Sequence, residues 1–481
     1  MQTLYERVAE KITRQIDVGA YRSGDRLPGV RKLSVQFAVS ISTVTHALSI
    51  LENSGLVVGR ARSGFYVRAR LLYRPGFPAI SSPPSKPMAV KGWDVVGRLL
   101  KATGEPDFVH FGAAIPPANL LPVKAVQRAM VAAAKRSEKW LAGYSFSPGL
   151  PELRRQLARR MMGYGCQVNP DDIIATNGCT EAYSLALRAV AEPGDVIAIE
   201  SPCYYGLLQV LESLGMKAME IPTDSNVGIS LPALKTAIGR WPVKACVLVT
   251  NFSNPLGYCM PDEKKRELVE ILALRKIPLI EDDIYGDLCF GGERPRPARA
   301  FDAAGNVLYC SSFSKTISPA LRLGWIDAGI YKEKLEFLKY ASNMATPTFS
   351  QLVIANILEH GGYERYLRQV RPVYERLVRD MIQAVGKYFP KGTKVTQPHG
   401  GFAVWVEMPK RVDALVMFED ALAQRISIAP GPAFSASQKY KNFIRLNCAL
   451  PWNEKAEKAL VTLGRIAEKL NASPPVKNIR G

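Results

Sequence analysis

The sequence contains no C-x-x-C pair, and its eight cysteines are scattered over 481 residues. Such usage favours reduced thiols in the cytoplasm over a disulfide framework or a zinc site. The four histidines, at positions 46, 110, 360 and 399, are too dispersed to form a metal motif. No apolar run reaches the ~18 residues of a membrane-spanning helix, and the charged N-terminus lacks the apolar core of a signal peptide. We therefore expect no metal, no membrane anchor and a cytoplasmic location.

Acidic residues are few compared with basic ones: 43 Asp and Glu stand against 63 Lys and Arg, which gives a net charge of +20. Residues 1–70 alone carry eleven basic and five acidic side chains. A positive excess raises the affinity for polyanions such as nucleic acid, but a generally basic surface explains the total charge equally well. The length suggests two to four domains of ~150 residues each.

Residues 1–68 are expected to form a first domain, a small basic module of three helices and a hairpin. Apolar residues recur at every fourth position of the first helix: Leu4, Val8, Ile12 and Ile16. Pro28 is expected to begin the second helix, and a break at residues 38–40 precedes the third. The inner face of the third helix is apolar: Val44, Ala47, Leu48 and Leu51. Its outer face begins with small polar residues: Ser42, Thr43, Thr45 and His46.

Two short helices with polar side chains leading the second suit a recognition helix in the major groove of DNA. A hairpin over residues 56–67 follows, and its tip holds Arg60 and Arg62, which can touch the DNA backbone or minor groove. The plainer alternative is a protein-interaction module in which the hydroxyl groups only cap helices.

Residues 4–67 resemble the winged helix-turn-helix of GntR-type regulators. The residues that carry the resemblance are Gly24-Asp25-Arg26-Leu27-Pro28, Arg31, Val39-Ser40, Thr43-Val44, Ala47, Leu51-Glu52, Gly55-Leu56 and Gly64-Phe65-Tyr66-Val67. The resemblance implies binding to double-stranded DNA through Arg31, Arg60, Arg62, Gly64 and the outer face of the third helix. Phe65 stands where the family more often has Thr.

Residues 69–92 are rich in Pro, Ser and Gly and are expected to be a linker. A proline-rich arm strapped onto the following domain is the alternative for part of this segment.

Residues 93–481 are expected to form the second domain, because short apolar runs alternate there with helical patterns. The expected strands are residues 173–176, 196–200, 218–221, 245–250, 278–281, 307–310 and 324–327. The alternation predicts an α/β fold with a mostly parallel central sheet covered on both faces, whose ligands collect at the C-terminal ends of the strands. Long helices and later strands at 401–407 and 443–447 predict a smaller C-terminal α/β lobe from about residue 345.

The strand expected at 307–310 leads through three serines and a phenylalanine to Lys315, and Arg322 follows seven residues later. A lysine at the end of a buried strand is poorly solvated, which lowers its pKa and makes the neutral amine accessible. Such an amine can condense with an aldehyde, and a nearby arginine can neutralise a phosphate. The pair indicates pyridoxal 5′-phosphate (PLP); a surface lysine beside a solvated arginine is the plainer alternative.

Polar residues also follow the other expected strands, and each is a weak signal by itself. Cys179 and Thr180 open a helix whose N-terminal N–H groups could bind phosphate. Tyr204 could stack on a ring or be an ordinary loop residue. Asn254 could donate to a phenolic oxygen, and Asp282 could keep a pyridine nitrogen protonated or cap a helix.

The order of these signals resembles fold-type I PLP-dependent enzymes of the class I aminotransferase group, over residues of about 108–470. The series is Gly-x-Thr, an aromatic residue, Asn-Pro-x-Gly, Asp-x-x-Tyr, Ser-x-x-Lys, Arg and a late Arg. The resemblance implies that Lys315 holds PLP as an aldimine and that Asp282 pairs with the ring nitrogen. Asn254 and Tyr285 would contact the phenolic oxygen, and Tyr204 would stack on the ring.

The same resemblance assigns the remaining contacts of the cofactor. The phosphate would be held by Cys179, Thr180, Ser312 and Arg322. Tyr144 would be lent by the neighbouring subunit, which implies a homodimer. Arg445 would bind the carboxylate of a substrate or effector; a surface arginine on a strand is its alternative. Cys179 stands where the family often has Ser, a small departure because that contact is largely from the backbone.

A GntR-like module followed by an aminotransferase-like body resembles the MocR subfamily of transcriptional regulators. The resemblance implies a PLP-dependent, DNA-binding regulator that senses PLP or an amino compound. Lys315, Asp282, Tyr285 and Arg445 are all present, so an active aminotransferase with an attached DNA reader is the alternative. An apo scaffold that binds only DNA is a third hypothesis.

Overall fold

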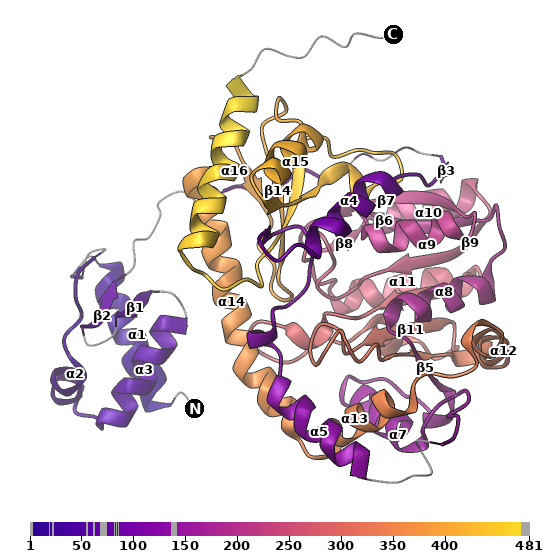
Figure 1. Cartoon of the computed structure of the whole chain (residues 1–481), viewed down its shortest axis with the longest axis horizontal. Helices are drawn as coiled ribbons and strands as arrows, with labels where there is room; N and C mark the ends of the chain where they lie inside the picture. Colours follow the sequence, from indigo (N-terminus) through magenta and orange to yellow (C-terminus); the bar gives the residue numbers. More distant parts are fainter. Residues whose placement is uncertain are drawn as a thin grey trace. The chain divides into compact units, whose positions relative to one another are not determined.

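The computed structural model describes residues 3–472 except 19, 22–23, 54–55, 61–62, 68–74, 81, 83, 85 and 136–141. The chain divides into two compact units, Met1–Arg74 and Pro75–Gly481. Figure 1 colours them along the sequence, the first in indigo and the second from violet to yellow. Within the described residues no single helix has the length and apolar composition of a membrane span; Val30–Phe37 and Ile41–Glu52 would reach it only as a pair bent by 109°.

The first unit consists of three helices and a hairpin: α1 (Leu4–Asp17), α2 (Val30–Phe37), α3 (Ile41–Asn53), β1 (Val57–Arg60) and β2 (Gly64–Val67). The inner face of α3 packs against α1, and the residues predicted to face inward, Val44, Ala47, Leu48 and Leu51, expose at most 1% of their surface. The winged helix-turn-helix is therefore confirmed. One local prediction is wrong: α2 begins at Val30, after the N-cap Gly29, rather than at Pro28. Of the apolar face of α1, Val8, Ile12 and Ile16 are buried, whereas Leu4 is 60% exposed.

The turn between α2 and α3 depends on Ala38, which ends α2 in the left-handed conformation (φ 52°, ψ 46°). An L side chain there costs ~1–2 kcal/mol, whereas glycine adopts this conformation freely but loses ~0.5–1 kcal/mol of chain entropy. We expect Ala38→Gly to stabilise the first unit by ~0.5–1 kcal/mol. Hydrogen exchange of the amides of α2 and α3 in the full chain measures the change. Ala47→Gly, in the buried middle of α3, is the matched control and should destabilise the same amides.

Part of the expected linker belongs to the second unit. β3 (Met88–Ala89) pairs antiparallel with β7 (Lys217–Asp224) at the edge of the main sheet. Upstream, Gly76 O accepts a hydrogen bond from Val395 N at 2.9 Å, and Ala79 N donates to the Glu407 carboxylate at 2.9 Å. Main-chain pairing needs no apolar side chains, so a composition rich in proline and serine does not reveal it. For these residues the expectation of a linker reaching residue 92 is corrected, and the alternative, a proline-rich arm on the following domain, holds instead.

The second unit is built on a nine-stranded sheet of order β3-β7-β6-β9-β10-β11-β12-β5, with β8 (Gly228–Ile229) paired to β7. The other strands are β5 (Ile173–Thr176), β6 (Val196–Ser201), β9 (Val243–Leu248), β10 (Leu279–Asp282), β11 (Val307–Ser312) and β12 (Gly324–Asp327). Five neighbouring strands of this order run parallel to one another: β7, β6, β9, β10 and β11. β12 is antiparallel to both of its neighbours, β11 and β5. The prediction of a mostly parallel sheet is confirmed.

Helices cover both faces of this sheet because alternate residues of each strand point to opposite sides. On β6, Ile197 and Ile199 pack against α8 (Cys179–Val190) and α9 (Tyr205–Ser213). Val196 and Ala198 join the opposite cluster, which contains α10 (Leu231–Arg240) and α11 (Asp262–Leu274). α12 (Lys332–Asn343) lies beside α8. A further layer is formed by α5 (Val123–Lys135), α7 (Pro151–Gly163) and α13 (Thr348–Glu359).

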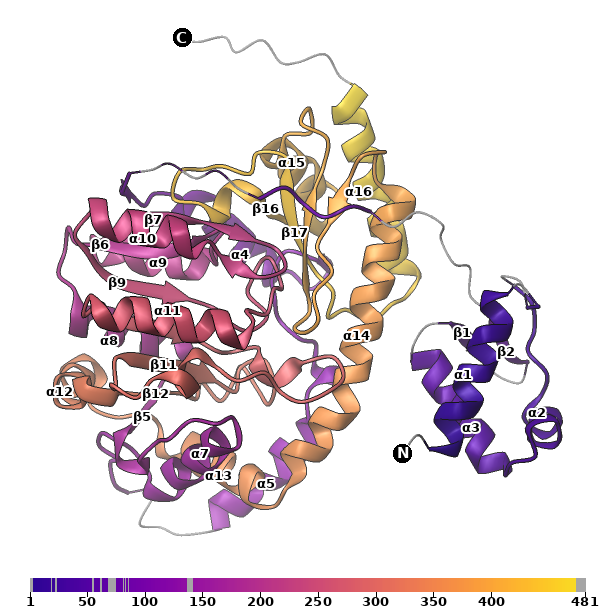
Figure 2. The same ribbon diagram turned by 180° about the vertical axis from the view of Figure 1, so that it is seen from behind.

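The smaller lobe has a second sheet of order β13-β14-β17-β16. Its elements are β13 (Lys394–Val395), β14 (Ala403–Glu407), β16 (Ala429–Pro430), β17 (Phe443–Asn447), α15 (Ala414–Ala423) and α16 (Glu454–Ala472). The long helix α14 (Gly362–Tyr388) runs along the side of the unit to this lobe, as Figures 1 and 2 both show. The lobe also includes an early segment, since β4 (Val109–His110) pairs with β15 (Ile426–Ser427), and α4 (Trp93–Thr103) precedes β4.

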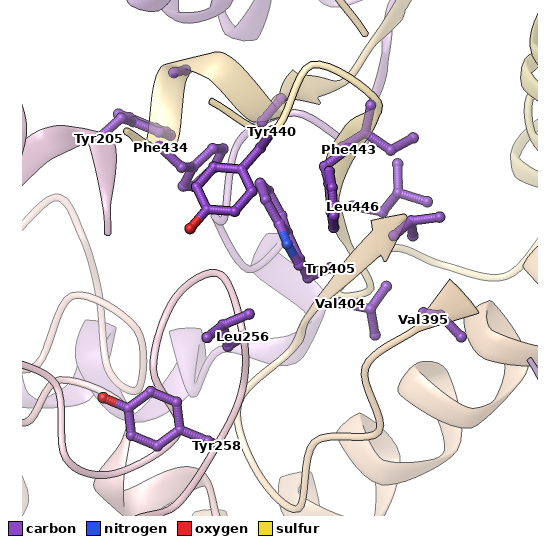
Figure 3. Close-up of a cluster of buried hydrophobic side chains, with 14 of the residues drawn as sticks. Tyr205, Leu256, Tyr258, Val395, Val404, Trp405, Phe434, Tyr440, Phe443 and Leu446 are labelled. Atoms are coloured by element: carbon purple, nitrogen blue, oxygen red, sulfur yellow. The ribbon is translucent and has the colours of Figure 1, made fainter. Parts of the chain in front are cut away.

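The core of the lobe is aromatic and extends toward the main sheet (Figure 3). Trp405 is 1% exposed and stacks on Phe443 with ring centroids 5.4 Å apart. Its ring also meets the edge of Phe434 at 5.2 Å, and Phe434 in turn meets Tyr205 at 5.4 Å. Tyr205 opens α9 but belongs to the same buried cluster as Val196 and Ala198 of β6, so this chain of rings joins the small lobe to the face of the sheet that α10 and α11 cover.

Candidate functional site

A cavity of about 200 Å³ lies at the C-terminal ends of the central strands, where an α/β sheet binds its ligands. Residues spread between Leu100 and Arg322 form its wall. The wall includes these residues singled out from the sequence: Cys179, Thr180, Tyr204, Asn254, Asp282, Tyr285, Ser312, Lys315 and Arg322. The fold therefore brings together side chains that the sequence separates by more than a hundred positions.

Lys315 follows β11 and lines this cavity. Its Nζ donates a hydrogen bond to Ala114 O at 2.7 Å. Burial lowers the pKa of Lys315 to about 8; the positive charges of Arg445 and Arg322 act in the same direction, and Asp282 opposes them. About a tenth of the amine is then neutral at pH 7, against well below 1% for an ordinary lysine. Lys315 can therefore act as a nucleophile near neutral pH.

Asp282 ends β10 and is 8% exposed. Its Oδ1 accepts hydrogen bonds from Cys179 Sγ at 3.4 Å and from Ile284 N at 3.2 Å. Burial raises the pKa of Asp282 to about 6, while the hydrogen bond from Cys179 favours the ionised form. The carboxylate is mostly charged at pH 7. A turn and the short 3-10 helix η3 (Gly286–Leu288) follow, so Asp282 caps no α-helix.

The N-terminus of α8 and Arg322 form a cradle for an anion. Gly178 precedes α8 with φ 86°, and a Cβ there would lie 2.5 Å from Arg322 Nη2. Gly324 faces it on β12, where a Cβ would lie 2.5 Å from the Gly178 carbonyl carbon. Arg322 Nη2 donates to Asn177 O at 3.1 Å. Free N–H groups of a helix N-terminus and a guanidinium together suit a phosphate, and Ser312 lines the same cavity.

Tyr285 and the amide of Asn254 also belong to the polar part of the cavity wall. Tyr285 is 5% exposed and meets Phe402 edge-on, with centroids 5.5 Å apart. Burial raises the pKa of Tyr285, so its hydroxyl stays protonated and can donate a hydrogen bond. Asn254 Oδ1 is buried and has no partner among the described residues. An orphaned buried amide atom at a cavity wall is the mark of a polar ligand.

Two of the residues singled out from the sequence lie outside this wall. Tyr144 is 70% exposed and stacks on Phe146 at 5.4 Å. Arg445, on β17, is fully buried and is therefore not the surface arginine of the alternative interpretation. Its charge nevertheless acts on the pKa of Lys315, Tyr285 and Tyr204.

Sequence reasoning missed several residues of the wall. Tyr183 lies one turn after Thr180 on α8, so the helical period could have identified it. Leu100, Ala114 and Ile115 also line the cavity, but they are ordinary small or apolar residues. They reach the site because β4 pairs with β15 about 300 positions later, and no local sequence pattern predicts that pairing.

The first unit presents the polar surface that the sequence indicates. On α3, Ser42, Thr45 and His46 are exposed, Thr43 is half-buried, and Arg31 of α2 is exposed. His46 stacks on Tyr5 of α1 with ring centroids 4.2 Å apart. Gly64 begins β2 with φ 99°. Arg62 and the side chain of Arg60 lie outside the described residues, so their contacts with DNA stay predictions.

Two families match the chain, in the order of its units. Residues 4–67 match "Bacterial regulatory proteins, gntR family", and residues 112–463 match "Aminotransferase class I and II". Over nearly its whole length the chain is similar to two HTH-type transcriptional regulators of Escherichia coli (strain K12). YjiR is 39% identical over 96% of this chain and 98% of its own length. YdcR is 37% identical over 97% and 99%.

Solved structures resemble the second unit. A multiple substrate aminotransferase from Thermococcus profundus has a TM-score of 0.73 and 27% identity, over 78% of this chain and 95% of its own. LysN, an α-aminoadipate aminotransferase from Thermus thermophilus, has a TM-score of 0.72 and 27% identity, over 79% and 95%. The LysN structure is complexed with N-(5′-phosphopyridoxyl)-L-leucine.

Proposed function

Because this chain belongs to the MocR type of regulator, a gntR-family DNA-binding domain fused to an aminotransferase class I and II domain, we propose that its second unit binds PLP. The state of that site then controls how its first unit binds DNA. The observation that carries the proposal is the cavity that joins Lys315, Asp282 and Arg322 on one wall. The phosphopyridoxyl ligand of LysN supports the same cofactor.

The residues of the cavity fit PLP chemically. Lys315 supplies an amine for the aldehyde, and the cradle of Arg322, Ser312, Cys179 and Thr180 supplies positive charge and N–H groups for the phosphate. Asp282 is an anion for the protonated ring nitrogen. The hydroxyl of Tyr285 and the Nδ2 amide group of Asn254 can donate hydrogen bonds to the phenolic oxygen, and Tyr204 suits the ring face. When bound, PLP supplies an electron sink and an aldehyde that primary amines attack.

Uptake of PLP by the cofactor-free protein should accelerate with pH between about 6 and 9, with a midpoint near the Lys315 pKa of about 8. Only the neutral amine attacks an aldehyde, and the neutral fraction rises from ~10% at pH 7 to ~50% at pH 8. Stopped-flow absorbance measures the rate. A rate that does not change across this range, or one that rises only above pH 10, contradicts the assignment of Lys315.

For the first unit we propose double-stranded DNA as the partner, read by Ser42, Thr43, Thr45 and His46 of α3. Arg31, Arg60, Arg62 and Gly64 would contact the backbone or the minor groove. Since such regulators read two half-sites as dimers, we propose a homodimer. In it Tyr144, which is 70% exposed and outside the cavity of its own subunit, would reach the phosphate in the other subunit. A DNA-binding role also supports a cytoplasmic location.

Control of DNA binding follows from linkage. If the second unit has two arrangements, a ligand that binds one of them more tightly shifts the equilibrium toward that arrangement. The shift, set by the ligand's difference in affinity for the two arrangements, changes the affinity or the spacing of the two DNA readers. Selection of bound DNA from a random pool, with and without PLP and candidate amines, tests this. We expect a sequence with two half-sites whose enrichment depends on PLP. Identical pools in all conditions would refute the regulatory link, and the absence of enriched DNA would refute DNA reading.

An active aminotransferase is the second candidate, because the wall also contains every residue needed to move a proton at the cofactor. The neutral Lys315 amine can accept one, and Asp282 and Tyr285 stay in place to stabilise charge. Steady conversion of a keto acid in the presence of an amino donor would establish this activity. We expect at most slow turnover if the site senses rather than converts its ligand.

A further inference from the structure

The first turn of α8 carries an acidic residue next to the anion cradle. Glu181 is the third residue of α8, directly after Cys179 and Thr180. A carboxylate at this position of a helix can turn back and accept hydrogen bonds from the N–H groups that open the helix. The proposed function assigns those N–H groups to the phosphate. An unrestrained Glu181 would therefore compete with the phosphate for them and repel its negative charge.

Three donors hold the carboxylate of Glu181. Lys339 Nζ donates to Oε2 at 2.8 Å, and Asn177 N donates to the same oxygen at 2.6 Å. Asn343 Nδ2 donates to Oε1. Lys339 and Asn343 are one turn apart on α12, which lies beside α8 (Figures 1 and 2). Both oxygens of Glu181 are therefore bound by groups that do not line the cavity.

Lys339 is a buried cation paired with Glu181. It exposes 1% of its surface, and its Nζ lies 2.8 Å from the Glu181 carboxylate. Burial lowers the pKa of Lys339, and the hydrogen bond and charge of Glu181 act in the opposite direction. Asn177 connects this ion pair to the cradle, because Asn177 O accepts a hydrogen bond from Arg322 Nη2 at 3.1 Å. The Glu181 carboxylate therefore joins α12 to the turn that Arg322 contacts.

From these contacts we propose that Lys339 and Asn343 are positioning residues for the phosphate of the cofactor. They hold the Glu181 carboxylate against α12, so the N–H groups that open α8 stay available to the phosphate. Lys339 also offsets the charge of Glu181 beside a phosphate that carries roughly two negative charges at pH 7. The inference rests on the proposed function, because it concerns how the anion cradle binds the phosphate of PLP.

Absorbance titration of the full-length, cofactor-free protein with PLP and with pyridoxal tests the inference, because pyridoxal has the same aldehyde but no phosphate. Lys339→Met frees Glu181 and leaves its charge unpaired. We expect this variant to bind PLP ~10-fold or more weakly than the wild type, while its affinity for pyridoxal changes by less than ~2-fold. Glu181→Gln combined with Lys339→Met also removes the negative charge, so the double variant should bind PLP within ~3-fold of the wild type.

Two further variants complete the experiment. Lys332→Met is the matched control, because Lys332 is on the same helix, lies 3.8 Å from Asp172 and has a side chain that is 34% exposed; it should bind both ligands like the wild type. Asn343→Ala decides the question if Lys339→Met does not fold. Asn343 is exposed, and its loss should weaken binding of PLP by ~3-fold but leave binding of pyridoxal unchanged.

The outcomes separate this inference from the function on which it rests. Equal losses of affinity for PLP and pyridoxal in Lys339→Met would mean that Lys339 only supports the fold. A double variant that does not regain PLP binding would mean that the Glu181 carboxylate is not the cause. Either result overturns the inference, as does a folded Lys339→Met protein with the wild-type affinity for PLP. A wild-type protein that takes up no PLP overturns the proposed function itself.

Discussion

Lys315→Ala should lose PLP on dialysis at least ~100-fold faster than the wild type, a difference of ~3 kcal/mol, and its DNA binding should no longer respond to PLP. The variant removes the lysine amine that lines the same cavity as Asp282 and Arg322. The anion cradle remains, so the phosphate can still bind reversibly, but the covalent bond to the aldehyde cannot form. DNA binding in the absence of PLP should be unchanged, because α3 and the hairpin belong to the other unit.

Lys315→Arg is the matched control for charge. It keeps a cation beside Ala114 O and Asp282 but has no amine that can condense with an aldehyde. If covalent capture is the switch, both variants lose the response to PLP. If loss of the positive charge at this position is the switch, Lys315→Arg behaves like the cofactor-free wild type and Lys315→Ala behaves like the cofactor-bound wild type. Retention of PLP by Lys315→Ala at the wild-type rate, with an unchanged absorbance band, would refute the assignment of Lys315.

The main sheet and its cavity could be predicted because both rest on short-range patterns. Apolar runs such as β10 and β11 are buried on both faces. Asp282 ends β10 and Lys315 follows β11, so the two residues must meet at one edge of a parallel sheet. The wall opposite these residues could not be predicted. Leu100 and Ile115 are ordinary apolar residues in sequence, and only the pairing of β4 with β15 brings them to the cavity.

The second feature that could not be predicted from the sequence alone is main-chain pairing in a polar segment. The proline-rich stretch before α4 offers no apolar periodicity, and yet β3 extends the main sheet and Gly76 bonds to the small lobe. For a related reason, the sequence did not decide whether Arg445 is buried or exposed. A strand arginine has the same sequence pattern whether it faces solvent or an interior ligand, and only the fold shows which side it takes. The predicted roles of Tyr144 and Arg62 stay predictions.

Behind the cavity, a buried ion network holds the segment that carries Tyr285. Asp287, in η3, accepts hydrogen bonds from Arg294 Nε at 2.7 Å and Arg160 Nη2 at 3.2 Å. It also accepts from the hydroxyls of Tyr164 at 2.9 Å and Tyr363 at 2.7 Å. Arg160 is on α7 and Tyr363 on α14, so one carboxylate joins the strand end to two helices. Loss of its charge would leave two largely buried guanidinium groups with fewer anions.

Asp287→Asn should therefore lower the free energy of unfolding of the second unit by ~3–5 kcal/mol at pH 7, the usual cost of breaking a buried ion pair from one side. Urea unfolding followed by tryptophan fluorescence measures it. The control is Asp107→Asn, because Asp107 pairs with Arg425 at 3.0 Å while both side chains are mostly exposed; it should change stability by less than ~1 kcal/mol. Since Asp287 lies two residues after Tyr285, PLP should also bind more weakly to Asp287→Asn than to Asp107→Asn.

The pKa of Asp287 decides how the stability difference between wild type and Asp287→Asn changes with pH. Burial acts to raise the pKa of Asp287, but the charges of Arg160 and Arg294 outweigh it and hold the pKa well below its usual range. A group with a depressed folded pKa stabilises the protein fully above its unfolded pKa of ~4 and progressively less as the pH falls below it. The stability gap between wild type and Asp287→Asn should therefore be constant from pH 6 to 8 and shrink below about pH 4. A gap that instead grows on acidification would mean that Asp287 is neutral in the folded protein, and the network would then be hydrogen-bonded rather than ionic.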